Sequence, residues 1–126
     1  MQNNLNASSK VKNLFYLYEN QKFKKLEREC YKVINSSFSS SLIYNLLGVS
    51  LTKQLKLKKA INIFKSALKL DASNTDTLVN LGLAQKEAKL FNEAINSNSK
   101  AIEINPNCFQ AYINLSDLYN IKQNFF

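Results

Sequence analysis

The feature that most constrains this chain is an interval of 34 residues at which the same residue types recur. The two glycines of the sequence, Gly48 and Gly82, are 34 positions apart. Four further pairs keep the interval: Leu47 and Leu81, Ala60 and Ala94, Ile61 and Ile95, and Ala67 and Ala101. If copies begin at positions 7, 41, 75 and 109, the seventeenth position is apolar in all four: Phe23, Leu57, Phe91 and Phe125. A period of this length is typical of helical repeats, in which each unit is one pair of helices.

Apolar residues within each copy follow the helical period in two segments, which predicts one antiparallel helical hairpin per repeat. The expected helices cover residues 8–20 and 23–34, 41–54 and 57–70, 75–88 and 91–104, and 109–121. Asn124 is expected to cap a further helix that would begin at Phe125. Residues 1–6 are largely polar, and we expect them to be disordered. The rest is predicted to be one solenoid over residues 7–126, with repeats at 7–40, 41–74, 75–108 and a truncated copy at 109–126.

The residues at these intervals resemble the tetratricopeptide repeat (TPR), which has a 34-residue period and the pattern W-x2-L-G-x2-Y, A-x3-F, P. The second copy carries Tyr44, Leu47, Gly48, Leu51, Ala60, Phe64 and Ala67 at the pattern positions. The third copy carries Leu78, Leu81, Gly82, Ala94, Ala101 and Pro106, and departs from the pattern at Gln85 and Asn98. The resemblance implies an all-α fold, a right-handed TPR superhelix of antiparallel helix hairpins with about three and a half repeats.

The resemblance also implies a binding surface, because in TPR proteins the first helix of each hairpin lines a concave face. The residues at the positions that face this surface are Asn45, Val49, Val79, Asn80, Leu83, Lys86, Ile113, Asn114 and Asp117. In the O-linked N-acetylglucosamine transferase type of TPR, asparagines at the position of Asn80 and Asn114 hold the backbone of an extended peptide. A carboxamide suits this role because it carries both a donor and an acceptor. A solvated or helix-capping role for these asparagines is the alternative.

The net charge of +8 is concentrated in the first two repeats. Lys22, Lys24 and Lys25 lie at the turn between the two expected helices of the first repeat and the start of the second helix, and they recur 34 residues later as Lys56, Lys58 and Lys59. Stacked hairpins would align these six residues, called here the lysine edge, at helix starts where cations oppose the helix dipole. Binding of an acidic partner, RNA or anionic lipid is one explanation, and a solubilising lysine-rich surface is the other.

The sequence offers no catalytic, metal-binding or cofactor-binding constellation. Histidine is absent, which excludes triads and acid–base pairs built on it. The two cysteines, Cys30 and Cys108, have no CxxC partner, and Cys30 fits a buried apolar position. We therefore expect no enzymatic activity and no cofactor. No apolar run approaches the ~20 residues of a membrane span, and the first residues lack the pattern of a secretory signal, so a cytoplasmic location is expected.

The predicted function is a protein–protein interaction module that binds a peptide or partner helix in the concave groove. One alternative is a non-catalytic N-terminal domain that presents substrate to, or regulates, a larger transferase-like enzyme. Another is binding of the lysine edge to RNA or an anionic membrane surface, although nucleic acid and membranes are not the favoured partners. A receptor for chaperone C-termini is disfavoured, because the positions of the family's basic clamp hold Val11, Phe15, Asp76 and Asn80.

The last expected helix lacks the second helix that completes a repeat. Tyr112, Ser116 and Tyr119 occupy the positions that this second helix would cover. Two explanations remain open: the chain continues beyond Phe126 in a longer protein, or another copy covers this face by self-association.

Overall fold

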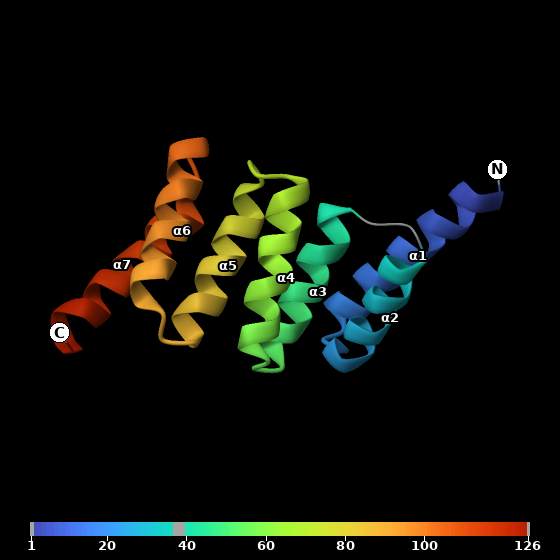
Figure 1. The fold of residues 1–126 in the computed structure, drawn as a ribbon, viewed down its shortest axis with the longest axis horizontal. Helices are drawn as coiled ribbons and strands as arrows, with labels where there is room; N and C mark the ends of the chain where they lie inside the picture. The colour runs from blue at the N-terminus through green and yellow to red at the C-terminus, as the bar shows by residue number, and fades with distance from the viewer. Residues whose placement is uncertain (1, 37–39, 126) are drawn as a thin grey trace.

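The computed structural model describes residues 2–36 and 40–125, which form seven helices and no strand (Figure 1). The helices are α1 (Gln2–Glu19), α2 (Phe23–Asn35), α3 (Ser41–Lys53), α4 (Leu57–Leu70), α5 (Thr75–Glu87), α6 (Phe91–Ile104) and α7 (Phe109–Phe125). Figure 1 shows them as hairpins that stand side by side in chain order, with α7 following α6. The predicted all-α solenoid of helical hairpins is therefore confirmed.

The helix boundaries follow the 34-residue register except at the two ends of the chain. Both α4 and α6 begin and end at the expected residues. In contrast, α1 begins at Gln2 and so includes residues 2–6, for which the sequence predicts disorder. The last helix, α7, passes through Asn124 to Phe125. The prediction that Asn124 caps a new helix is therefore wrong. Neither segment contains the glycine or proline that would interrupt a helix, which accounts for both differences.

Polar side chains cap the first helices of the second and third hairpins. Ser40 precedes α3, and its Oγ accepts a hydrogen bond of 3.4 Å from the Ile43 amide. Asn74 precedes α5, and its Oδ1 accepts a bond of 3.1 Å from the Thr77 amide. The neighbouring serines at 37 and 39 lie outside the described residues. These caps fix where the helices that carry the concave face begin.

The turn within each hairpin has the same backbone conformation in all three copies. Gln21, Leu55 and Lys89 have φ angles of 56°, 61° and 64°, in the left-handed region. In each turn the next residue donates a backbone hydrogen bond back across the helix end: Lys22 to Leu17, Lys56 to Leu51, and Leu90 to Gln85, at 2.8–2.9 Å. This pattern is the Schellman motif that ends helices, here built without glycine. The repeat therefore extends to the path of the backbone at the turns.

Gly48 and Gly82 lie where the two helices of a hairpin cross closely. A Cβ atom at Gly48 would stand 2.6 Å from Cδ1 of Phe64 in α4, and one at Gly82 would stand 3.2 Å from Cγ of Asn98 in α6. Both glycines are buried, and so are the alanines of the second helices that recur at the 34-residue interval: Ala60, Ala67, Ala94 and Ala101. The predicted close crossing is thus present in both hairpins, although the residue that fills it differs.

The interior changes character along the solenoid. A large apolar cluster extends from α1 to α5, with Leu14, Leu26, Leu47 and Phe64 among its buried members. Between α5, α6 and α7 the apolar cluster is small and consists of Leu78, Val79, Ala101 and Ala111. Polar side chains fill the remaining space there, and they are described with the site below.

Cys30 is buried in α2, where its thiol behaves as a small apolar group. Burial, and to a smaller extent the neighbouring charge of Glu29, raises the pKa of this thiol to about 12, so the thiol stays protonated.

Within residues 2–36 and 40–125, no helix combines the length and apolar character needed to cross a membrane.

Candidate functional site

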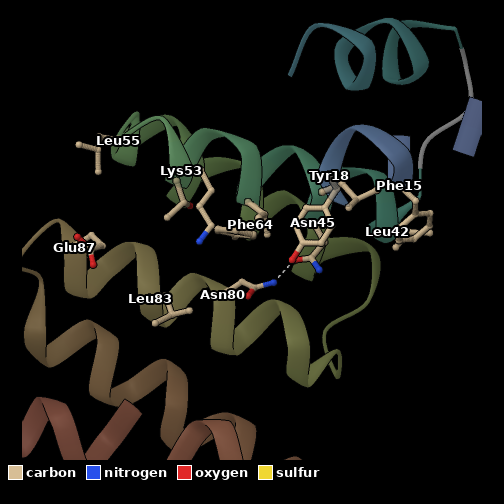
Figure 2. Close-up of a pocket in the computed structure, with 13 residues that line it drawn as sticks. Phe15, Tyr18, Leu42, Asn45, Lys53, Leu55, Phe64, Asn80, Leu83 and Glu87 are labelled. Atoms are coloured by element: carbon tan, nitrogen blue, oxygen red, sulfur yellow. Dashed lines mark hydrogen bonds between the residues drawn. The ribbon is translucent and has the colours of Figure 1, made fainter. Parts of the chain in front are cut away.

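A groove of about 590 Å³ lies between α1, α3 and α5, on the face formed by the first helix of each hairpin (Figure 2). Most of its lining comes from these three helices. The lining residues are Phe15, Tyr18, Leu42, Asn45, Leu46, Val49, Thr52, Lys53, Leu55, Phe64, Asn80, Leu83 and Glu87. Pockets of this size, mainly apolar with a few polar groups, are typical ligand sites.

Four of the nine predicted groove residues come together in this groove: Asn45, Val49, Asn80 and Leu83. The other five do not line it. Lys86 lies 3.9 Å from the carboxylate of Asp117 and so joins α5 to α7, and Ile113 is exposed on α7.

Two of the predictions are wrong because the side chains are buried in packing. Val79 belongs to the small apolar cluster between α5 and α7. Asn114 is only 3% exposed, and its Nδ2 donates a hydrogen bond of 3.2 Å to Oδ1 of Asn98 in α6. Asn98 in turn donates to the Ala94 carbonyl at 2.9 Å. A bound peptide could reach Asn114 only by breaking this network, so the predicted pairing of Asn80 with Asn114 along a ligand is corrected.

Asn80 instead pairs with Asn45, across α5 and α3. Its Nδ2 donates a bond of 3.1 Å to Oδ1 of Asn45, as Figure 2 shows. Among the described residues, the Nδ2 group of Asn45 and the Oδ1 atom of Asn80 have no further hydrogen-bond partner. The pair therefore presents one donor and one acceptor to the groove, which is the complement of a peptide unit.

The two ends of the groove differ in chemistry. Phe15, Tyr18 and Leu42 gather at one end, whereas Lys53 and Glu87 stand toward the other, with the Asn45–Asn80 pair between them (Figure 2). One cation and one anion leave this groove close to neutral. An occupant with apolar side chains fits it better than a strongly acidic one.

The three residues of the apolar end were absent from the sequence prediction, although a signal for them existed. Phe15 and Tyr18 are at the ninth and twelfth positions of the first copy, 34 residues before Val49 and Thr52. Leu42 is at the second position of the second copy. These are positions that the TPR resemblance assigns to the concave face. Applying them to the weakly matching first repeat would have identified Phe15 and Tyr18, and applying the second position to the second repeat would have identified Leu42.

All six residues of the lysine edge are exposed, and one of them forms an ion pair. Lys22, Lys24, Lys25, Lys58 and Lys59 are exposed and form no ion pair within the described part of the chain. Lys56 instead approaches Glu27 of the preceding hairpin, with its Nζ 2.8 Å from Oε1. Gln54 donates to the same carboxylate at 3.0 Å. Lys56 therefore joins two neighbouring repeats, although its side chain is still 41% exposed.

The same contacts perturb the titration of Glu27. Burial would raise the pKa of this carboxyl, but the hydrogen bonds from Lys56 and Gln54 and the charges of Lys56 and Lys59 oppose it and lower the pKa below its ordinary value of 4.5. A carboxyl whose pKa is lower in the folded state stabilises the fold above the ordinary pKa, and this contribution disappears as the pH falls through the lowered pKa.

We expect Glu27→Gln to lower the free energy of unfolding by up to about 1 kcal/mol at neutral pH, since the ion pair between repeats is lost. The difference from the parent should shrink below about pH 4.5, where the parent carboxyl begins to protonate. Urea unfolding at neutral pH and near pH 3 measures this. Glu103→Gln, at an exposed residue, is the control. Equal effects of the two substitutions at neutral pH would contradict the assignment.

The outer face of α7 is uncovered within the described residues. Tyr112, Ser116 and Tyr119, predicted to lack their covering helix, are exposed, as are Phe109 and Ile113. Nothing in the structure shows what covers them, so self-association through this helix stays a prediction.

This arrangement of hairpins and groove is that of a known family of repeat proteins. The family model described as "Tetratricopeptide repeat" matches residues 42–74 and 75–108. These segments comprise more than half of the chain, and they coincide with the hairpins α3/α4 and α5/α6. The chain belongs to the tetratricopeptide repeat family. No curated protein matches the chain.

Solved structures share the fold over nearly the whole chain. The second TPR domain of the human RPAP3 protein, in complex with the HSP70 peptide SGPTIEEVD, is 19% identical, with a TM-score of 0.85 over 92% of this chain and 97% of that one. The first TPR of Spaghetti, bound to the HSP90 peptide SRMEEVD, is 16% identical, with a TM-score of 0.86 over 93% of each chain. MamA is 21% identical, with a TM-score of 0.87 over 94% of this chain and 69% of that one. At these identities the likeness concerns the fold.

Proposed function

We propose that this chain is a non-catalytic protein-interaction module that binds an extended peptide or partner segment in the groove between α1, α3 and α5. The observation that carries the proposal is the Asn45–Asn80 pair, which presents a free donor and a free acceptor in the middle of an otherwise mainly apolar groove. These groups can pair with a backbone peptide unit whatever its side chain is. The apolar end then accommodates side chains on either side of that unit.

The groove favours an internal segment with apolar side chains over an acidic chain end. The two peptide-bound structural neighbours carry ligands that end in acidic residues. In this chain the positions of the family's basic clamp hold Val11, Phe15, Asp76 and Asn80, none of which is cationic. Lys53 is the one cation that lines the groove within the described residues, and Glu87 lines the same end. A free carboxylate would find little compensation for its desolvation there.

The test is selection of binders from a library of short random peptides, followed by measurement of their dissociation constants. Asn45→Ala/Asn80→Ala should weaken selected peptides about ten- to thirtyfold, since two hydrogen bonds to the peptide backbone are lost. Asn62→Ala/Asn96→Ala is the matched control, because these asparagines are exposed on the second helices α4 and α6. We expect the control to bind like the parent and the peptide SRMEEVD to bind neither protein. Selected peptides that bind the Asn45/Asn80 variant as tightly as the parent would refute the proposal.

A further inference from the structure

We propose that the lysine edge is a docking surface for an anionic lipid bilayer, next to the peptide groove, with Leu55 lining the groove at the point where the two surfaces meet. The turns within the three hairpins lie along the same side of the molecule, the lower side in Figure 1. Because the turns share one backbone conformation, matching residues of successive repeats occupy equivalent places on that side. Five exposed lysines that form no ion pair in the described part of the chain therefore lie on that side, at the starts of α2 and α4, and are called here the basic strip.

The charge of this strip is not balanced within the first turns of its own helices. Neither α2 nor α4 has an acidic residue in its first turn, and neither has a side-chain cap. The equivalent turn of α6 differs, because it contains Glu93. Acidic residues near the strip include Glu19, at the end of α1, Glu87, which lines the groove together with Leu55, and Glu27, which bonds Lys56 and also feels the charge of Lys59. Cations repeated at helix starts oppose the helix dipole, and an external anion relieves that repulsion.

An exposed leucine stands at the tip of the second of these turns. Leu55 is 71% exposed, directly before Lys56, and Leu90, one position further along the third turn, is 39% exposed. Leu55 also has a φ of 61°, a conformation that is unfavourable for a leucine. Lysines around a projecting aliphatic side chain match the two layers of a bilayer surface. The ammonium groups meet anionic headgroups, while the leucine enters the boundary with the acyl chains.

The aliphatic tips favour lipid over RNA. Proteins that bind single-stranded nucleic acid combine basic groups with aromatic platforms on which bases stack. At this edge the pair Tyr18 and Phe23 have their rings in edge-to-face contact, 6.5 Å between centroids, and Tyr18 also lines the groove. Leucine side chains cannot replace a stacking platform. The bilayer is therefore the partner whose chemistry the edge fits.

The first experiment measures co-sedimentation of the full chain with vesicles of phosphatidylcholine containing about a quarter phosphatidylserine. We expect binding that weakens as salt is raised and that is absent with phosphatidylcholine alone. Replacing Lys22, Lys24, Lys25, Lys58 and Lys59 with glutamine should weaken binding at least tenfold. The matched control replaces five exposed lysines elsewhere, Lys10, Lys12, Lys65, Lys69 and Lys100, with the same change in net charge. The affinity of the control for the anionic vesicles should stay within about twofold of that of the parent.

A second variant, Leu55→Asn, separates docking from folding and from general charge. Asparagine tolerates a positive φ better than leucine, so the variant should melt at or above the temperature of the parent. We expect it to bind the anionic vesicles several-fold more weakly, because the inserted side chain is lost. The proposal is overturned if the edge variant and the lysine control bind alike, or if Leu55→Asn leaves vesicle binding unchanged. It is also overturned if the chain binds mixed RNA more tightly than the anionic vesicles. The five-lysine variant should bind peptides as the parent does. A negative result with vesicles would therefore leave the proposal for the peptide groove intact.

Discussion

Gly48→Leu is expected to lower the free energy of unfolding by about 3 kcal/mol, a fall in Tm of roughly 10 °C. The added Cβ alone would stand 2.6 Å from Cδ1 of Phe64, and the rest of the side chain would enter the crossing of α3 and α4. Phe64 is fully buried in the main apolar cluster, so a shift of its ring would disturb the packing of its neighbours. The helix propensity gained by removing a glycine, about 1 kcal/mol, is too small to offset this.

Thermal and urea unfolding measure the effect. The matched control is Asn62→Leu, at an exposed position of α4, which should change stability by less than about 0.5 kcal/mol. A second comparison pairs Gly48→Ala with Phe64→Leu. The double variant should be more stable than the sum of the two single changes predicts, because the smaller side chain makes room for the new methyl group. Additive effects would mean that Gly48 is not packed against Phe64.

The sequence predicted the architecture because the repeat constrains every level of it. The 34-residue interval placed the bounds of α4 and α6 correctly and located Gly48 and Gly82 at close crossings. The turns could not be predicted as fully. Gln21, Leu55 and Lys89 adopt a left-handed conformation usually associated with glycine, and nothing in these three side chains signals it. The conformation is instead required by the hydrogen bonds that end each helix.

The groove was predicted only in part, since a repeat position fixes where a residue lies but not what it faces. Asn80 and Asn114 share a position, yet their neighbours on the preceding helix differ: Phe64 occupies in α4 the place that Asn98 occupies in α6. A phenyl ring offers no amide partner, and Asn80 bonds Asn45 across the groove. Asn98 offers an acceptor, and Asn114 is held in the interior. The departure of Asn98 from the family pattern was visible in the sequence, but its consequence for Asn114 required the packing.

Asn98→Leu and Asn114→Leu should each lower the free energy of unfolding by about 2 kcal/mol. The double variant should lower it by less than either single change. Each single change leaves a buried amide group of the other asparagine without the partner it has in the parent, 3.2 Å away. Both residues are at most 3% exposed, so water cannot replace that partner freely. When both become leucine, no polar pair remains to be satisfied, and similar volume fills the space beside Gly82.

A double-mutant cycle of urea unfolding measures the coupling between the two residues. Asn62→Leu and Asn120→Leu form the control cycle, because both asparagines are exposed and lie on different helices. Their effects should be small and additive. Peptide affinity supplies the second measurement. If Asn114 holds helices together, the folded double variant binds selected peptides like the parent, because the Asn45–Asn80 pair is untouched. If Asn114 contacted ligand, affinity would fall without any coupling in stability, and the groove would extend toward α7.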